Sequence, residues 1–238
     1  MKTFFSLLLL FSISLGNLQA QLIKNIINTV SKKSTGTDQG SSDISDGLKQ
    51  ALQVGTERGL QKLSAVDGFF ANAVIKILMP EEAKKVEQKL RAIGLGNQVD
   101  NAVLAMNRAA EDAAKTAAPV FINAIKQMSI QDALGILRGG DFAATDYLKS
   151  KTTLELTNAF RPIIEESLKK VDATKYWNTI FNTYNKFSFN KVNPDLSAYV
   201  TEKGLSGIFY QLGLEEQKIR KDPAARTTDL LKKVFGMK

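Results

Sequence analysis

The chain has 238 residues, a formal net charge of +8, and neither cysteine nor histidine. These two absences exclude disulfide bonds, Ser-His and Cys-His catalysis, and zinc, copper or iron sites with imidazole ligands. The 32 basic residues are interspersed with 24 acidic ones, which predicts a mixed, solvated surface and no nucleic-acid partner.

The first twenty residues have the pattern of a secretory signal peptide. Lys2 supplies the positive charge, residues 4–15 form the apolar core, and the expected cleavage site lies between Ala20 and Gln21. No cysteine follows the apolar run, so a lipoprotein anchor is excluded, and no later run reaches the roughly 20 apolar residues that span a bilayer. We therefore expect an exported, periplasmic protein without a transmembrane segment, with secretion as the alternative location.

Residues 22–33 carry an apolar face with the spacing of a short helix. This face indicates either docking on the envelope surface or on a protein partner, or packing back on its own domain. Residues 34–42 have the composition of a flexible linker. The sequence thus predicts a signal peptide at 1–20, an N-terminal amphipathic helix and linker at 21–46, and one domain at 47–238.

The remaining sequence repeats apolar residues at steps of three and four, the spacing of α-helices. The longest pattern covers residues 100–128, with an alanine-rich face and an interior Pro119 that is expected to kink or interrupt the helix. No alternation typical of strands occurs. The predicted fold is all-α, a single domain of about 8–10 helices around a long central helix at 100–128. The shorter helices are expected at 43–63, 72–79, 80–93, 129–138, 141–148, 152–171, 174–184 and 195–212.

Capping residues indicate where several of these helices begin. Ser129 and Asp132 match a capping box, and Asp141, Thr152 and Asp195 are each expected to open a helix. At the other end of the chain, residues 222–235 combine an Asp-Pro helix start with several apolar side chains. They predict a short closing helix that docks on the domain.

Four peptides together resemble the DUF4197 family, exported bacterial proteins with no assigned function. The resemblance covers residues 47–236 and implies a helical, exported protein from a bacterium with an outer membrane. It supplies no catalytic residue. The peptides are DGFFANAVIKILMP (67–80), MNRAAEDAAKTAAPVF (106–121), MSIQDALGILRGGDFAATDYL (128–148) and EEQKIRKDPAARTTDLLKKVFG (215–236).

Asn107, Arg108 and Glu111 are polar residues on the predicted central helix, where neighbouring helices would cover them. One interpretation is a polar pocket in which Arg108 binds a carboxylate or phosphate. The other is a hydrogen-bond network that ties loops to the helix, since buried polar groups need partners in any fold. We favour the network.

A second charged cluster contains Glu216, Arg220 and Arg226. Glu216 and Arg220 are four residues apart, in the order that favours an ion pair on a helix. The neighbouring Glu215 makes acid–base chemistry or hard-cation binding an alternative, although the spacing of a calcium loop is missing. An ion-pair network that anchors the C-terminal peptide is the preferred interpretation.

No catalytic constellation, metal site or cofactor motif emerges from the sequence. The leading hypothesis is a non-enzymatic, exported protein that binds a partner or forms part of the envelope. The alternative is a carrier with a helical cavity for a small apolar or anionic ligand, and a carboxylate-based hydrolase is a more distant one. The six residues named as a candidate ligand site are Asn107, Arg108, Glu111, Glu216, Arg220 and Arg226.

Overall fold

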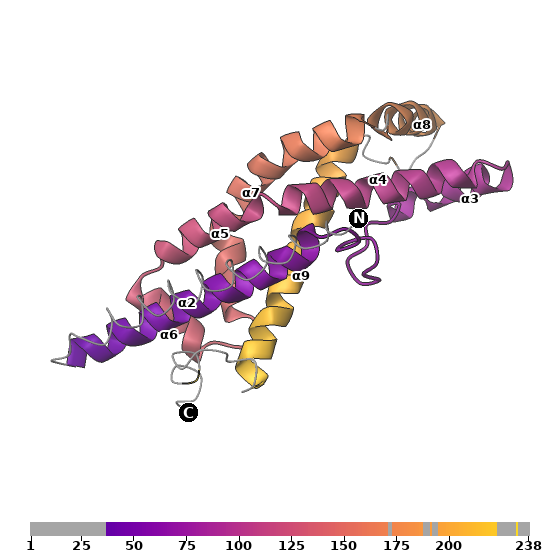
Figure 1. The fold of residues 1–238 in the computed structure, drawn as a ribbon. Coiled ribbons are helices and arrows are strands. Elements are labelled where there is room, and N and C mark those ends of the chain that lie inside the picture. Colours follow the sequence, from indigo (N-terminus) through magenta and orange to yellow (C-terminus); the bar gives the residue numbers. More distant parts are fainter. Residues whose placement is uncertain (1–36, 171–172, 188–190, 192–194, 223–231, 233–238) are drawn as a thin grey trace, which may run out of the picture. The chain divides into compact units, whose positions relative to one another are not determined.

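The computed structural model describes residues 37–170, 173–187, 191, 195–222 and 232 (Figure 1). The predicted signal peptide, the apolar face at 22–33, Arg226 and nearly all of the predicted closing helix lie outside these residues. The chain divides into two compact units, Met1–Ser42 and Asp43–Lys238. Helix α2 crosses the boundary, and all later helices belong to the second unit.

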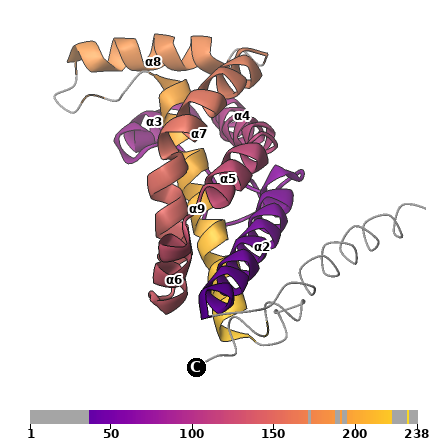
Figure 2. The same ribbon diagram turned by 90° about the vertical axis from the view of Figure 1, so that its left-hand side faces the viewer.

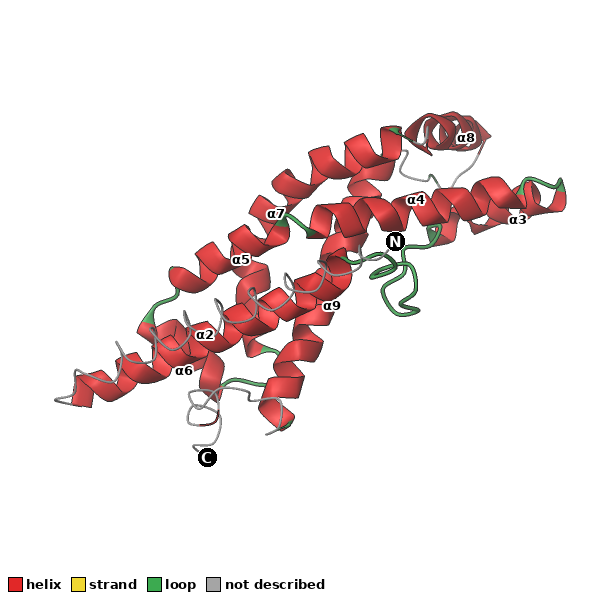
Figure 3. Cartoon of the chain, viewed as in Figure 1, coloured by secondary structure: helices red, strands yellow, loops and turns green. Residues whose placement is uncertain are grey.

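The described residues contain helices and turns and no strand (Figure 3), so the prediction of an all-α fold is confirmed. Helix α2 begins within the segment predicted to be a linker. The elements are α2 (Thr37–Ser64), the 3-10 helix η1 (Glu81–Ala83), α3 (Lys84–Ala92), α4 (Gly96–Ala114), α5 (Ala117–Lys126), α6 (Ile130–Arg138), α7 (Ala143–Lys169), α8 (Ala173–Phe187) and α9 (Leu196–Lys221).

Helix α7 packs on both α9 and α4, and α9 in turn packs on α4 (Figure 2). One continuous cluster of buried apolar side chains includes residues from α2 and from each of α4 to α9. The alanines in the second half of α4 (Ala109, Ala110, Ala113 and Ala114) are buried. Gly204 of α9 lies opposite Ala110, where an added Cβ would be 3.6 Å from the alanine Cβ. Small residues on both helices therefore allow α4 and α9 to approach closely.

The predicted central helix at 100–128 is interrupted, and it forms the two helices α4 and α5. The break falls at Lys115 and Thr116, close to the carbonyl with which Pro119 would clash in a continuous helix. The Thr116 hydroxyl donates to the Ala113 carbonyl at 2.8 Å and so satisfies one group at the end of α4. Pro119 itself lies in the first turn of α5, where its missing N–H costs little.

The prediction of a helix at residues 72–79 is wrong. Residues 76–80 form neither helix nor turn, and turns precede them. Pro80 at their end has extended backbone angles (φ −62°, ψ 153°), and we call residues 76–80 the extended segment. The main-chain N–H and C=O of Ile77 are both bonded to the side chain of Asn107, so they are not available to a helix. A residue 30 positions away thus overrides the local apolar pattern.

The two segments predicted as separate helices, 141–148 and 152–171, form the single helix α7, which continues through Pro162. Thr152 does not cap a helix, because its hydroxyl donates to the Leu148 carbonyl inside α7 at 2.7 Å. Asp141 does not cap α7 either, and its carboxylate pairs with Lys221. By contrast, the capping box of Ser129 with Asp132 and the Asp195 cap of α9 are both present.

Candidate functional site

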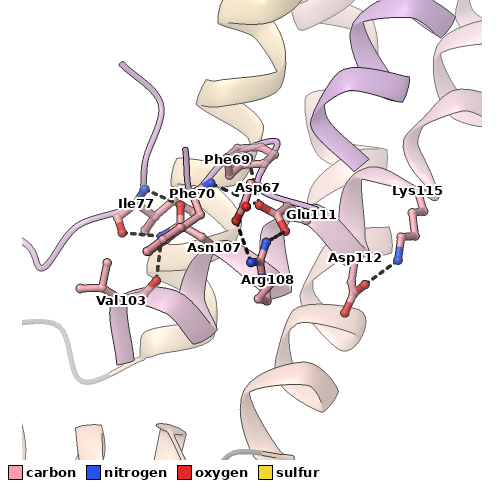
Figure 4. Close-up of polar contacts among 10 residues, drawn as sticks. All are labelled: Asp67, Phe69, Phe70, Ile77, Val103, Asn107, Arg108, Glu111, Asp112 and Lys115. Carbon is pink, nitrogen blue, oxygen red and sulfur yellow. Dashed lines mark hydrogen bonds and ion pairs between the residues drawn. The ribbon is translucent and has the colours of Figure 1, made fainter. Parts of the chain in front are cut away.

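Asn107 lies on α4 and is fully buried. Its amide nitrogen donates to the carbonyls of Ile77 at 2.8 Å and Val103 at 2.7 Å, and its amide oxygen accepts from the Ile77 N–H at 2.9 Å (Figure 4). Three of the four hydrogen bonds that an asparagine amide can make are therefore formed. Asn107 holds the extended segment against the core.

Glu111 lies one turn later on α4 and holds the preceding turn. One carboxylate oxygen accepts from the main-chain N–H groups of Phe69 at 3.0 Å and Phe70 at 3.2 Å. The other accepts from Arg108 at 2.6 Å, and Arg108 also donates to Asp67 at 2.7 Å (Figure 4). Hydrogen bonds to Glu111 and then to Asp67 raise the pKa of Arg108 above its ordinary value.

The turn that Glu111 holds has a demanding backbone. Asp67 has a φ of 67°, in the left-handed region. A Cβ added to Gly68 would overlap the main chain at Lys62 and Leu63, so glycine is required there by close approach. Asp67 and Gly68 thus form a turn, and Glu111 binds the main chain of the two residues that follow it.

Glu216 of α9 acts at the start of α7. Its carboxylate accepts from the N–H groups of Ala144 at 2.9 Å and Thr145 at 2.8 Å, and from the Thr145 hydroxyl at 2.7 Å. These are N–H groups that a helix leaves without partners in its first turn. A carboxylate there also interacts favourably with the helix dipole. Glu216 therefore caps the start of α7, which is the role predicted for Asp141 from the sequence.

Arg220 forms the predicted pair with Glu216, with its Nε 2.9 Å from the carboxylate. It also donates to the Ile136 carbonyl near the end of α6 at 2.7 Å. The pair therefore joins the end of α6 to the start of α7 through α9. The neighbouring Glu215 is buried and binds Lys62 of α2.

Arg226 lies outside the described residues, and the structure places the other five predicted site residues in two groups. Asn107, Arg108 and Glu111 hold residues 67–77, and Glu216 with Arg220 holds the α6–α7 connection. Their hydrogen bonds and ion pairs are with main-chain groups and charged side chains of the protein. A ligand-binding role for these residues remains a prediction.

A groove that the sequence did not indicate lies beside the extended segment. It has a volume of about 790 Å³, and its walls are residues 74–82 and one face of α9, with Trp177 of α8 also in the lining. Three of its apolar or aromatic side chains are well exposed, namely Val74 (67%), Leu78 (54%) and Tyr210 (41%). A helix at 72–79 would not have formed this wall, so the prediction of that helix concealed the groove.

Tyr199 joins the two walls of the groove, because its hydroxyl donates to the Leu78 carbonyl at 2.9 Å. Burial, followed by the nearby carboxylates of Glu82, Glu202 and Glu81, raises the pKa of Tyr199 to about 12. The phenol is therefore a neutral donor over the ordinary pH range. Its ring stacks on Trp177, with centroids 6.3 Å apart and planes at 21°.

The charges around the groove are balanced. Three lysines and three glutamates line it, so no single sign of charge dominates. They are Lys76, Lys191, Lys203, Glu81, Glu82 and Glu202. A second groove of about 370 Å³ lies between α7 and α9 and shares Ala198, Glu202 and Ser206 with the first.

Within the described part of the chain, no group of three or more Asp or Glu side chains is placed to hold a metal ion. None of the helices described is long and apolar enough to cross a membrane.

Among curated proteins and among solved structures, none matches the chain. The DUF4197 family, described as "Protein of unknown function (DUF4197)", matches residues 38–236. The match begins near the start of α2 and includes α3 to α9, the extended segment and both polar clusters. The chain therefore belongs to the DUF4197 family.

Proposed function

We propose that this protein is an exported, non-enzymatic binding protein, and that the groove between residues 74–82 and α9 is its binding surface. The observation that carries the proposal is the exposure of Val74, Leu78 and Tyr210 around one groove. The volume of about 790 Å³ lies in the range of about 300–1,000 Å³ typical of ligand sites. The signal-peptide pattern at residues 1–20 supports the exported location.

The polar networks support binding in preference to catalysis. Glu111 and Glu216 are buried, and each accepts hydrogen bonds from main-chain N–H groups and an arginine. A hydrolase of the carboxylate type needs acids that reach a substrate and a water. Asn107 instead fixes Ile77 in the wall of the groove, which lowers the entropy that the wall would lose on binding. Glu111 fixes the turn that precedes this wall.

The first test is native mass spectrometry of the protein purified from its own envelope, compared with Leu78→Asp. An added charge at Leu78 should abolish retention of a bound species. Leu154→Asp is the matched control, since Leu154 is 76% exposed on α7 and does not line the groove. Equal retention by all three proteins would place the binding elsewhere and contradict the proposal.

A second test addresses the absence of catalysis. Chromogenic esters, phosphates, glycosides and peptides should give no turnover above that of buffer. Specific turnover that is lost in Glu216→Gln, but kept in the exposed control Glu166→Gln, would overturn the non-enzymatic assignment.

A small-ligand carrier is the second candidate, because a groove of this volume would also accept a single apolar or anionic molecule. The native mass decides between the two. One retained small molecule of constant mass supports the carrier, and a retained polypeptide supports a protein partner.

A further inference from the structure

We propose that the groove binds an extended polypeptide segment, which adds as a β-strand to the main chain of residues 76–78. This inference rests on the proposed function of the groove and names the chemical class of its occupant.

The wall of the groove has the features of a single β-strand. Residues 76–80 form neither helix nor turn, and Pro80 at their end has extended backbone angles. The N–H and C=O of Ile77 face the same side chain, Asn107, as they do in an extended residue, and the side chains of the segment alternate in exposure. Ile77 and Met79 are buried, at 2% and 7%, whereas Leu78 between them is 54% exposed and Lys76 is partly exposed. This is the period of two that a half-buried strand shows. The described part of the chain contains no β-strand with which this segment could pair.

The main-chain groups of this segment are only partly used. In an extended chain, successive residues direct their N–H and C=O groups to opposite edges. Ile77 uses both groups on Asn107, and the Leu78 carbonyl accepts from Tyr199. Within the described residues, the Leu78 N–H and the Lys76 carbonyl have no hydrogen-bond partner.

These two unused groups lie on the same edge and flank Ile77. They have the arrangement that one residue of a parallel strand would bind, donating its N–H to Lys76 and accepting from Leu78. Strand addition of this kind obtains affinity from the main chain and specificity from side-chain pockets. A small molecule would need a donor and an acceptor at the spacing of a peptide to use both groups.

The surroundings indicate what kind of peptide fits. Val74, Leu78 and Tyr210 offer exposed apolar contacts, and the charged residues of the groove are three lysines and three glutamates. At about 3.3 Å per residue, a strand of five residues spans roughly 16 Å, so residues 76–80 would match a segment of similar length. We therefore expect a segment of about five residues, with apolar side chains at alternating positions and little net charge.

The experiment starts from the full-length mature protein and a phage-displayed library of random peptides. Selected peptides are synthesised and titrated by fluorescence, because Trp177 is the single tryptophan of the chain and lines the groove. Each peptide is then N-methylated at one residue at a time. Methylation of the residue that donates to Lys76 should weaken binding at least tenfold, and methylation of its two neighbours should leave it within about twofold.

Two variants of the protein test the same edge. Leu78→Pro removes the N–H and should weaken binding at least tenfold, while Leu78→Ala keeps the N–H and should weaken it less. If Leu78→Pro does not fold, the methylation scan on the unmodified protein decides alone.

The outcomes separate this inference from the proposed function. Failure to select any peptide that binds, or a methylation profile without alternation, overturns strand addition. If native mass spectrometry then shows a small molecule lost in Leu78→Asp, the groove still binds and only its occupant was misassigned. If neither a peptide nor a small molecule depends on Leu78, both proposals fail.

Discussion

Asn107 forms hydrogen bonds with both main-chain groups of Ile77, as a neighbouring strand does in a sheet. Its amide presents a donor and an acceptor to the C=O and N–H of one residue, at 2.8 and 2.9 Å. This allows an extended segment to lie against helices with both polar groups satisfied, as burial requires. The side chain is therefore the reason that an apolar run in an all-helical domain is not itself helical.

Replacing Asn107 with alanine should lower the free energy of unfolding by about 2–4 kcal/mol, because two main-chain groups of a buried residue lose their partners. Asn101→Ala is the control, since Asn101 lies exposed on the same helix. Urea denaturation of both variants measures the difference. Equal stability of the two would mean that water replaces the amide and that Asn107 does not hold the segment.

Glu216→Gln should cost about 1–3 kcal/mol. Three donors from Ala144 and Thr145 approach its carboxylate, and an amide would direct its own N–H groups toward some of them. Glu166→Gln is the matched substitution at an exposed pair with Lys170 and should change stability by less than about 0.5 kcal/mol. Similar denaturation midpoints for the two variants would show that the start of α7 does not depend on this cap.

The phenol of Tyr199 gives a prediction about pH. Its folded-state pKa of about 12 lies above the ordinary value of 10, so the neutral form is the one that folding favours. The stability that Tyr199 contributes should be complete below about pH 10 and should be lost as the pH rises toward 12. Ultraviolet titration should show a late-titrating tyrosine that disappears in Tyr199→Phe and remains in Tyr210→Phe. Loss of the late-titrating component in Tyr210→Phe would show that it belongs to Tyr210 and not to Tyr199.

At the scale of elements, local signals predicted those features whose partners are near in sequence. The capping box of Ser129 and Asp132 spans three residues, and the break before Pro119 follows from a clash within one turn. The failures have distant causes. Asn107 acts on Ile77 across 30 residues, and Glu216 acts on Ala144 across 72. Such contacts depend on how the helices pack, which periodicity does not specify.

The same limit applies to the candidate site. Burial of polar residues on the predicted central helix was enough to indicate that Asn107, Arg108 and Glu111 need partners. The network interpretation expected these residues to hold loops, but not that one of the held segments would be residues 76–80, for which a helix was predicted. The groove was missed for that reason, because one of its walls consists of residues 74–82, which include part of the predicted helix and are not helical up to Pro80.

Two glycines of α9 offer a paired test of how closely elements pack. A Cβ at Gly207 would lie 2.5 Å from the buried ring of Phe69, whereas a Cβ at Gly204 would make an ordinary contact of 3.6 Å with Ala110. Alanine is favoured over glycine in a helix by about 1 kcal/mol. Gly204→Ala should therefore be neutral or stabilising by up to about 1 kcal/mol. Gly207→Ala should be destabilising by about 1–3 kcal/mol because of overpacking, and thermal melting compares them. The reverse order would show that Phe69 moves easily.

At the scale of the whole molecule, the second unit is held by one continuous core and by polar residues that connect its elements. The buried cluster includes Leu48 of α2, Met106 of α4, Trp177 of α8 and Leu212 of α9. The pairs Arg220–Glu216 and Lys62–Glu215 add polar links between α9 and its neighbours. Without cysteines, no disulfide contributes to this unit. Packing, hydrogen bonds and ion pairs must therefore supply its cooperativity.

This arrangement predicts a single unfolding transition for Asp43–Lys238 in the intact protein. Trp177 reports on α8 and far-ultraviolet circular dichroism reports on all helices, so the two curves should coincide in urea if the core unfolds as one. The Asn107→Ala change lies on α4, far along the chain from Trp177, and should shift both curves by the same amount. An earlier fluorescence transition that Asn107→Ala leaves in place would contradict this. It would mean that α8 and its contacts with α7 and α9 open separately, and that the groove, which Trp177 lines, loosens before the core does.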